Sequence, residues 1–345
     1  MSEIISQEKL RRLVGEWISA GKCVFGPRRL KPGSVLYAPL KAADELLLDG
    51  FIRPQNSIKE VVFPRHEVLY TYRLEGKKIS LGEPEPLSAE QIVVGARPCD
   101  AASLPILDHV FNWDYKDSFY NRRRELTTVI TLACSDHDKH CFCTSVGLGP
   151  DATRGSDILL VDLGDGSYEV RLVTDKGRKL LAGQTEQSSK VGQVPPGPAP
   201  KFDAKTLQAI LDGDFDSPLW QELTLRCMGC GACSYSCPTC HCFDIVDEGN
   251  ARGGVRAKNW DACQFGMFTL HASGHNPRSV QGNRQRQRLY HKFSIYPTKF
   301  GEILCTGCGN CTRNCPVSLG VLTVVQQAAR RIPVKSGSQA AVKST

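Results

Sequence analysis

The sequence predicts a mixed α/β domain at the N-terminus, followed by a mainly helical domain with a large insertion. Short apolar runs that alternate with Pro and Gly between residues 35 and 94 favour mixed strands and helices in the first part. Sixteen cysteines, most of them in the second part and at short spacings, indicate a domain built around metal. With 345 residues, the chain is long enough for two separate cores.

Changes in composition place the domain boundaries. Residues 1–187 form the predicted α/β domain. Residues 188–201 read SSKVGQVPPGPAPK and contain almost no apolar core material, which predicts a linker. Residues 202–333 form the predicted cysteine-rich domain, and we expect the tail at 334–345 to be disordered.

Apolar patterning predicts the main elements of the first domain. An amphipathic helix opens the chain over residues 7–20 and ends at Gly21. The elements predicted after it are a buried strand over 91–94, a helix over 101–111, a second buried strand over 127–132, and a hairpin over 157–163 and 168–173.

Four cysteines of the first domain follow these predicted strands or lie on the loop beyond them. Because binding sites are built at the ends of neighbouring strands in α/β sheets, the four could hold an iron–sulfur cluster of their own. The alternative is that they are inert buried thiols, since free cysteine is a common core residue. The four are Cys99, Cys134, Cys141 and Cys143.

Two cysteine runs dominate the second domain, and each has the spacing C-x2-C-x2-C-x3-C-P of a bacterial ferredoxin half-site. In that arrangement the chain turns into a helix before the fourth cysteine, which therefore ligates the partner 4Fe-4S cluster. Zinc ribbons use two C-x2-C pairs instead, so zinc is disfavoured. The predicted ligand sets are Cys227, Cys230, Cys233 with Cys315, and Cys305, Cys308, Cys311 with Cys237.

Helices are predicted on both sides of the two runs, over residues 202–226 and 317–332. The stretch between the runs is far longer than in a minimal ferredoxin and forms the predicted insertion. Residues 237–241 also match C-x-x-C-H, the pattern of covalent haem attachment, but the match overlaps the ferredoxin run and no export signal is found.

The sequence leaves the role of five further residues open. Cys240, Cys242 and Cys263 could form another metal site with a fourth ligand, or one of them could replace a ligand in the first domain. His271 and His275 could join Cys263 as ligands, although the Gly and Pro around them favour a loop and a structural role.

The charge pattern argues against nucleic acid. The formal net charge is +7, but each oxidised 4Fe-4S cluster with four thiolates contributes about −2, so the clusters would offset much of it. No nucleic-acid-binding module surrounds the basic stretch of the second domain. Two roles are favoured for its positive charge: it raises the potential of nearby reduced clusters, or it docks an acidic partner. The alternative is that the stretch is an ordinary solvated face. The stretch comprises Arg278, Arg284, Arg286, Arg288 and Lys292, with Tyr290 and Phe293 between them.

Absent motifs limit the function further. No run of about eighteen apolar residues and no secretory signal is found, so we expect a cytoplasmic protein without membrane insertion. Neither G-x-G-x-x-G after a strand nor G-x4-G-K-[ST] occurs, which leaves the chain without a nucleotide-binding fingerprint. No catalytic residue stands out.

Several motifs resemble those of a known family. They are GARPCDAASLPILDHVF, TLACSDHDKHCFCTSVG, CPTCHCFD, WDACQF, GHNPR and RQRLYHKF, and they extend from about residue 95 to residue 317. The sequence is similar to the iron–sulfur β subunits of soluble sulfhydrogenase-type nickel–iron hydrogenases, and equally to the corresponding iron–sulfur subunit of anaerobic sulfite reductase. Residues 95–143 also resemble, more weakly, the β subunits of deazaflavin-reducing hydrogenases, which carry a cluster and a flavin.

The resemblance implies an electron-transfer subunit of a multisubunit oxidoreductase. In that family the subunit relays single electrons between a flavin subunit that uses FAD and NAD(P)H and a separate catalytic subunit of the hydrogenase or sulfite reductase type. The alternative is a redox enzyme in its own right, with a flavin or substrate bound in the N-terminal domain beside Cys99. A cluster-bearing nucleic-acid-binding protein is a third, less favoured hypothesis.

Overall fold

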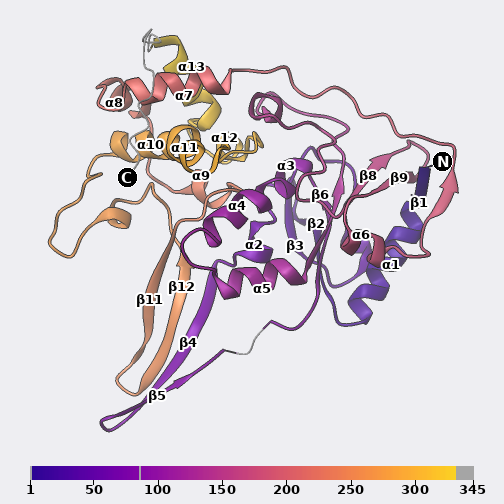
Figure 1. The fold of residues 1–345 in the computed structure, drawn as a ribbon, viewed down its shortest axis with the longest axis horizontal. Coiled ribbons are helices and arrows are strands. Elements are labelled where there is room, and N and C mark those ends of the chain that lie inside the picture. The colour runs from indigo at the N-terminus through magenta and orange to yellow at the C-terminus, as the bar shows by residue number, and fades with distance from the viewer. Residues whose placement is uncertain (1, 85–86, 332–345) are drawn as a thin grey trace.

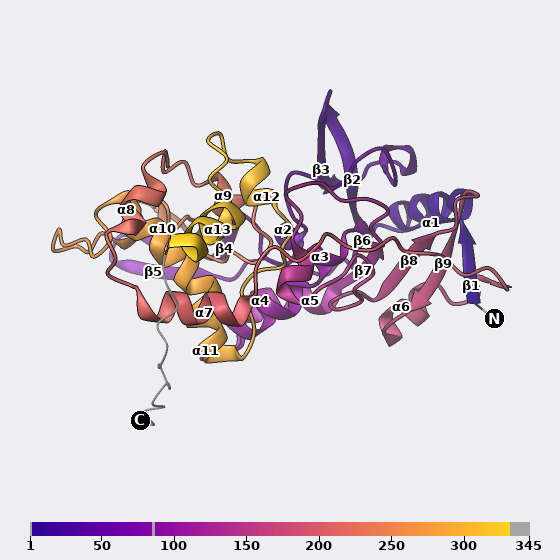
Figure 2. The same cartoon turned by 90° about the horizontal axis from the view of Figure 1, so that it is seen from above.

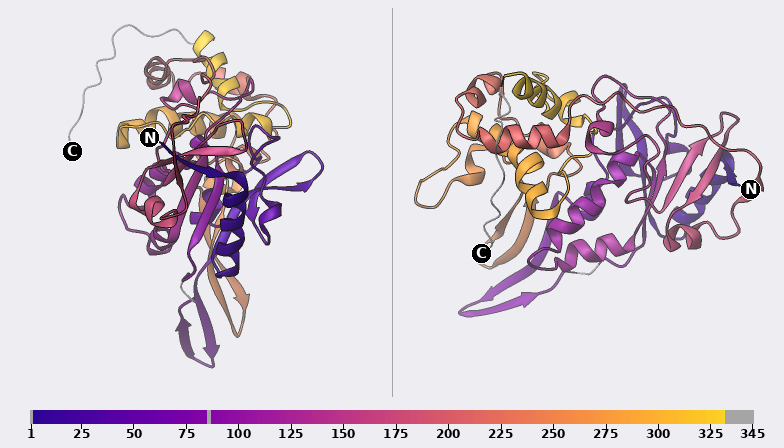
Figure 3. Two further views of the ribbon diagram at one scale, coloured as in Figure 1. Left: turned by 90° about the vertical axis from the view of Figure 1, so that its right-hand side faces the viewer. Right: turned by 45° about the horizontal axis from the view of Figure 1, so that its top comes forward.

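The computed structural model describes residues 2–84 and 87–331. An α/β half contains the N-terminal strand, a helical half contains the C-terminal helices, and a thin antiparallel arm projects from the molecule (Figure 1). Figure 2 shows the two halves side by side along the long axis, and Figure 3 shows the arm pointing away from both. The mixed α/β class predicted from the sequence is confirmed.

An eight-stranded sheet forms the centre of the α/β half, in the order β10-β1-β9-β8-β7-β6-β2-β3. The four neighbours β8, β7, β6 and β2 are parallel, and the outer pairs are antiparallel. Both predicted buried strands and the predicted hairpin are present. The strands are β1 (Ser2–Ser6), β2 (Cys23–Lys31), β3 (Ser34–Pro39), β6 (Gln91–Ala96), β7 (Thr127–Leu132), β8 (Ile158–Asp162), β9 (Ser167–Leu172) and β10 (Glu186–Ser188).

Helices cover both faces of this sheet because consecutive residues of a strand point to opposite sides. Ile92 and Val94 of β6 pack in one core with α1, whereas Val93 packs in another core with α4. Each fully buried side chain of this size contributes about 1.5–3 kcal/mol to folding. The helices are α1 (Gln7–Ser19), α2 (Lys59–Val62), α3 (Pro98–Ala101), α4 (Ser103–Phe111), α5 (Ser118–Leu126) and α6 (Asp175–Leu180), with 3₁₀ turns at Ala43–Glu45 and Cys143–Val146.

The arm is a four-stranded antiparallel sheet built from two distant segments, in the order β11-β12-β4-β5. Its strands are β4 (His66–Glu75), β5 (Lys78–Gly82), β11 (Phe243–Asn250) and β12 (Gly253–Trp260). Trp260 packs against Phe63, with ring centroids 5.6 Å apart, and the Lys59 ammonium lies 3.9 Å from the centre of its ring. The arm therefore joins the two halves through one shared sheet.

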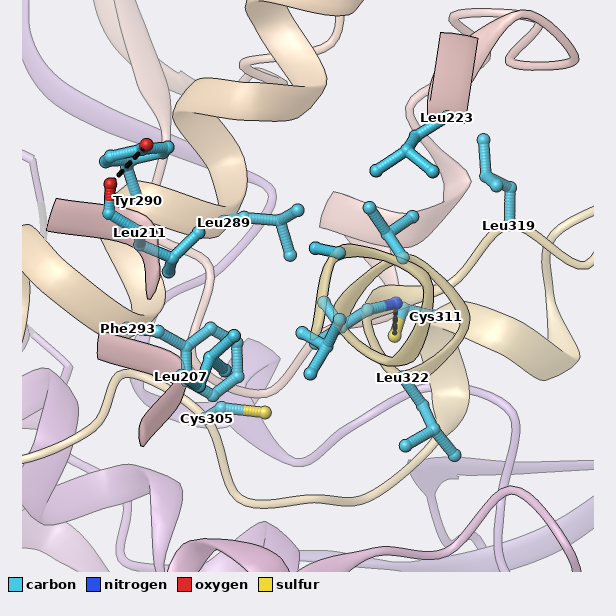
Figure 4. Close-up of a cluster of buried hydrophobic side chains, with 14 of the residues drawn as sticks. Leu207, Leu211, Leu223, Leu289, Tyr290, Phe293, Cys305, Cys311, Leu319 and Leu322 are labelled. Atoms are coloured by element: carbon cyan, nitrogen blue, oxygen red, sulfur yellow. Dashed lines mark hydrogen bonds between the residues drawn. The ribbon is translucent and has the colours of Figure 1, made fainter. Parts of the chain in front are cut away.

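The helical half has its own core, in which α13 packs against side chains of α7, α8 and α10 (Figure 4). The stretch between the cysteine runs contributes the β11–β12 hairpin as well as α10 and α11, so this half is not purely helical. Its helices are α7 (Ala204–Gly213), α8 (Leu219–Thr224), α9 (Ala232–Tyr235), α10 (Gln281–Tyr290), α11 (Tyr296–Phe300), α12 (Asn310–Arg313) and α13 (Val321–Arg331), with a 3₁₀ turn at Gly266–Thr269 and a π-helical turn at His291–Ile295.

The predicted domain boundaries remain predictions, because the two halves share the arm. Ser188, placed in the predicted linker, belongs to strand β10, and residues 189–203 form no helix or strand. The predicted tail at 334–345 lies outside the described residues. Within the part of the chain that the structure describes, no helix is long and apolar enough to span a membrane.

Candidate metal centres

The two ferredoxin-type runs have matching local structures. In each run, a glycine with left-handed backbone directly precedes a one-turn helix: Gly231 (φ 74°) before α9, and Gly309 (φ 77°) before α12. Glycine adopts this conformation without the strain that a Cβ would introduce. The first three cysteines of each run therefore lie on the loop and the start of its helix, and the fourth lies beyond the helix.

Two cavities adjoin these loops, and each is lined by three cysteines of one run and the fourth of the other. The first, here the Cys305 cavity, is lined by Cys305, Cys308, Cys311 and Cys237. The second, the Cys227 cavity, is lined by Cys227, Cys230, Cys233 and Cys315. The chain thus brings together the same two groups that ferredoxin spacing predicts.

The four cysteines of the first domain also lie around one cavity. This quartet cavity has a volume of about 220 Å³ and is lined by Cys99, Cys134, Cys141 and Cys143. Cys99 follows β6 and Cys134 follows β7, which are parallel neighbours, so the two lie at the same edge of the sheet. Because Cys308 lines the quartet cavity as well as the Cys305 cavity, the two cavities are adjacent.

Buried cations beside these cavities test whether iron–sulfur clusters fit. Arg97 lines the quartet cavity, Arg288 and Lys292 line the Cys305 cavity, and each of the three side chains is at most 4% exposed. None of them forms an ion pair with a carboxylate among the described residues. Burying an unpaired cation costs several kcal/mol, which favours a negatively charged occupant. A 4Fe-4S cluster with four thiolates carries about −2 and meets that requirement.

Buried nitrogen atoms without hydrogen-bond partners also indicate that these cavities hold a ligand. The Nε and Nη2 atoms of Arg288 and the Nε atom of Arg97 are buried without a hydrogen-bond partner in the described structure. Buried polar groups normally have partners, and an orphan indicates an absent ligand, ion or water. We conclude that the cysteines and cations of the quartet and Cys305 cavities fit clusters, and that the Cys227 cavity offers a matching set of four cysteines.

Donors from distant elements reach the cysteine sulfurs. Such hydrogen bonds stabilise thiolate ligands and tune the potential of a bound cluster. Those formed by side chains are Gln281–Cys227 (3.2 Å), Gln285–Cys227 (3.0 Å), Lys292–Cys237 (3.4 Å), Arg53–Cys99 (3.0 Å) and Arg313–Cys141 (3.1 Å).

Sequence reasoning missed the role of α10 and the helical turn after it. Gln281, Gln285, Arg288 and Lys292 follow one another at steps of four, three and four residues, so they share one helical face that lies toward the cysteines. Of the roles expected for the basic stretch, charge beside a cluster matches the buried positions of Arg288 and Lys292, and a solvated face does not. The helical spacing of these polar residues is the signal that could have revealed the face.

Arg53 is a second residue that the sequence did not single out. Its guanidinium forms a buried ion pair with Asp100 at 2.9 Å and also donates to Cys99 Sγ and to the Cys308 carbonyl at 3.1 Å. It therefore connects the quartet cavity with the loop of the Cys305 cavity. No local pattern around position 53 indicates this role, since its partners lie far away in the sequence.

Burial favours the neutral form of several of these thiols in the absence of iron. It raises the pKa of Cys305 and Cys308 to about 12, and the pKa of Cys233 to about 11. Cys237 differs, because a hydrogen bond with Cys240 and the nearby Lys292 ammonium lower its pKa well below the ordinary value, although burial opposes them. Iron binding would therefore release protons from Cys233, Cys305 and Cys308.

The structure separates the residues whose role was left open. Cys240 interacts with Cys237, and Cys242 interacts with Cys263, so these cysteines lie in two pairs and not in one group. Within the described ranges no group of three or more His, Cys, Asp or Glu side chains is placed to hold a single metal ion. The rings of His271 and His275 lie 5.4 Å apart on an exposed loop, and neither lines the three cavities.

Comparison with known protein families identifies the type of domain that contains the two cysteine runs. Residues 226–319 match the family model of the 4Fe-4S dicluster domain, so the chain contains an iron–sulfur dicluster domain of the ferredoxin type. No solved structure matches the chain.

A curated relative covers nearly the whole chain. The protein is 29% identical over 328 residues to sulfhydrogenase 2 subunit beta of Pyrococcus furiosus, which covers 88% of this chain and 91% of the relative. The two findings support the resemblance predicted from the motifs, namely to an iron–sulfur β subunit of the sulfhydrogenase type.

Proposed function

We propose that this chain is an electron-transfer subunit that relays single electrons through three 4Fe-4S clusters. The crossed ferredoxin sets, Cys227, Cys230, Cys233 with Cys315 and Cys305, Cys308, Cys311 with Cys237, hold two of them. Cys99, Cys134, Cys141 and Cys143 hold the third. The observation that carries the proposal is the set of three cysteine-lined cavities, two of which also have buried, unpaired cations on their walls.

The arrangement of the cavities supports a relay. The quartet and Cys305 cavities share Cys308. Arg288 lines the Cys305 cavity and donates to Gln285, which in turn lines the Cys227 cavity. A 4Fe-4S cluster accepts and releases one electron at a time, and the chain supplies spacing, burial and charge.

The partners follow from the relative and from what the sequence lacks. The relative is named as a subunit of a sulfhydrogenase, which supports membership of a multisubunit hydrogenase-type complex. This chain has no nucleotide-binding fingerprint. We therefore assign FAD and NAD(P)H to a flavin-containing partner subunit, and the terminal reaction to a catalytic subunit of the hydrogenase or sulfite reductase type, in a cytoplasmic complex.

The alternative, a flavin or substrate bound beside Cys99, fits the quartet cavity less well. Small-molecule sites usually have volumes of roughly 300–1,000 Å³. The quartet cavity has about 220 Å³, and cysteine sulfurs and the Arg97 guanidinium line it. A compact anionic group suits that lining better than an isoalloxazine ring.

Reconstitution with the partner tests the proposal. Alone, the anaerobically purified chain should not oxidise NAD(P)H, but after reduction by dithionite it should reduce a small dye. Adding the flavin subunit should give NAD(P)H-dependent dye reduction through this chain. Tightly bound flavin in the isolated chain, together with NAD(P)H oxidation, would favour the enzyme alternative.

A further inference from the structure

The Cys227 cavity reaches the molecular surface. Among the twelve cysteines that line the three cavities, Cys230 is the one whose side chain is exposed, whereas all four cysteines of the Cys305 cavity are buried. The rate of electron transfer falls steeply with distance through protein. An external redox centre can therefore approach a centre in this chain closely at Cys230.

Exposed apolar side chains occur close to Cys230 in sequence and on the two segments that its loop contacts. The cysteine loop packs against its two neighbours, because a Cβ on Gly229 would lie 3.1 Å from Gln281, and one on Gly231 would lie 2.6 Å from Phe265. Single exposed apolar residues are ordinary, but a group of them around one functional atom indicates a binding surface. We define the Cys230 face by Leu225 (80% exposed), Met228 (69%), Met267 (74%), Val280 (46%) and Cys230 itself.

The charge of the segments that build this face has one sign. Residues 223–243 and 262–301 contain no Asp or Glu, and the exposed Glu222 just before them is ion-paired with Arg331. Arg226 is exposed beside Leu225, and Arg278, two residues before Val280, is partly exposed. The buried Arg288 and Lys292 cannot contact a partner, so the surface charge comes from these other arginines. An apolar patch with a basic rim complements a protein whose redox centre is ringed by carboxylates.

We propose that the Cys230 face docks an acidic electron-transfer protein, which exchanges single electrons with the centre in the Cys227 cavity. The proposal rests on the proposed function, since it requires a cluster in that cavity. One electron leaves the reduced centre and enters the oxidised partner, and no bond or proton is exchanged. Methionine side chains adapt to different surfaces, and transient redox encounters need only small interfaces, so the face suits a brief contact.

Stopped-flow kinetics with a defined probe test the docking. The dithionite-reduced full chain is mixed with an oxidised, acidic [2Fe–2S] ferredoxin and, separately, with the small dye dichlorophenolindophenol. Leu225→Glu and Met267→Glu should each lower the second-order rate constant with ferredoxin by about tenfold at low salt, because they place like charge on the face. The dye reaction should not change. Ile79→Glu on β5 is the matched control, since Ile79 is 64% exposed on the distant arm.

The outcomes separate the two proposals. The wild-type rate constant with ferredoxin should fall as salt rises, and this result needs no variant. The docking proposal is overturned if that rate constant is independent of salt, if the face variants react as fast as wild type, or if Ile79→Glu lowers the rate equally. A wild-type chain without iron, or unable to reduce the dye, would instead overturn the proposed function and the docking with it.

Discussion

Replacing Lys292 with methionine should lower the potential of one cluster only. The Lys292 ammonium is buried, lies 3.4 Å from Cys237 Sγ and has no carboxylate partner among the described residues. An electron added to a cubane spreads over the cluster, so a separation of about 6 Å and an effective dielectric constant of about 20 give an interaction of about 3 kcal/mol. For a one-electron couple this corresponds to about 130 mV.

An EPR-monitored redox titration of the full chain measures this shift. The signal assigned to the Cys305 cavity should move to more negative potential, because the variant lacks the cation that stabilises the added electron in the wild-type chain. Lys292→Arg keeps the charge and should stay close to wild type. Lys299→Met removes an exposed lysine of α11 and is the matched control. A shift in Lys292→Met no larger than in Lys299→Met would refute the electrostatic reasoning.

Three further predictions concern the clusters themselves. Cys305→Ala should reduce the iron content by about four atoms per chain and abolish the electron relay. If the variant keeps the full iron content, Cys305 is not a cluster ligand. Cys134→Ala should reduce the iron content from about twelve to about eight atoms per chain and leave the EPR signals of the two ferredoxin-type clusters unchanged. If the wild-type chain contains only about eight iron atoms, the four cysteines of the quartet are buried thiols that bind no cluster. Removing iron with a chelator should lower the melting temperature in calorimetry, since Arg97, Arg288 and Lys292 then lack counter-charge, and equal melting of both forms would contradict this.

The sequence predicts most reliably what depends on local spacing. The two ferredoxin-type groups were predicted because three cysteines on a short loop and a fourth beyond one helical turn have few possible arrangements. The quartet was predicted from strand order, since Cys99 and Cys134 both follow buried strands that become parallel neighbours. In both cases a few residues of continuous chain determine where the sulfurs lie.

Contacts between residues far apart in the sequence could not be predicted. β4 pairs with β12 across a large separation in sequence, and neither strand has an apolar pattern that requires the other. Arg53 reaches Cys308, which lies 255 residues away. The sequence left open whether the basic stretch lies beside the clusters or on the surface, because arginine and lysine are rarely buried, and unpaired buried cations are stable only beside negative charge. A single sequence does not reveal such a cofactor-dependent environment directly.

The distribution of buried charge also orders two of the centres by potential. Lys292 lies on the wall of the Cys305 cavity, where its charge acts on Cys237 and Cys305, whereas Arg288 acts on Cys233 of the Cys227 cavity as well as on Cys311 of the Cys305 cavity. Positive charge and burial stabilise different redox states, but an unpaired cation close to the cluster favours the added electron directly. We therefore expect the Cys305 centre to have the higher potential of the two and to hold the first electron added. A redox titration in which the Cys227 centre is reduced first would show that burial outweighs the charge of Lys292.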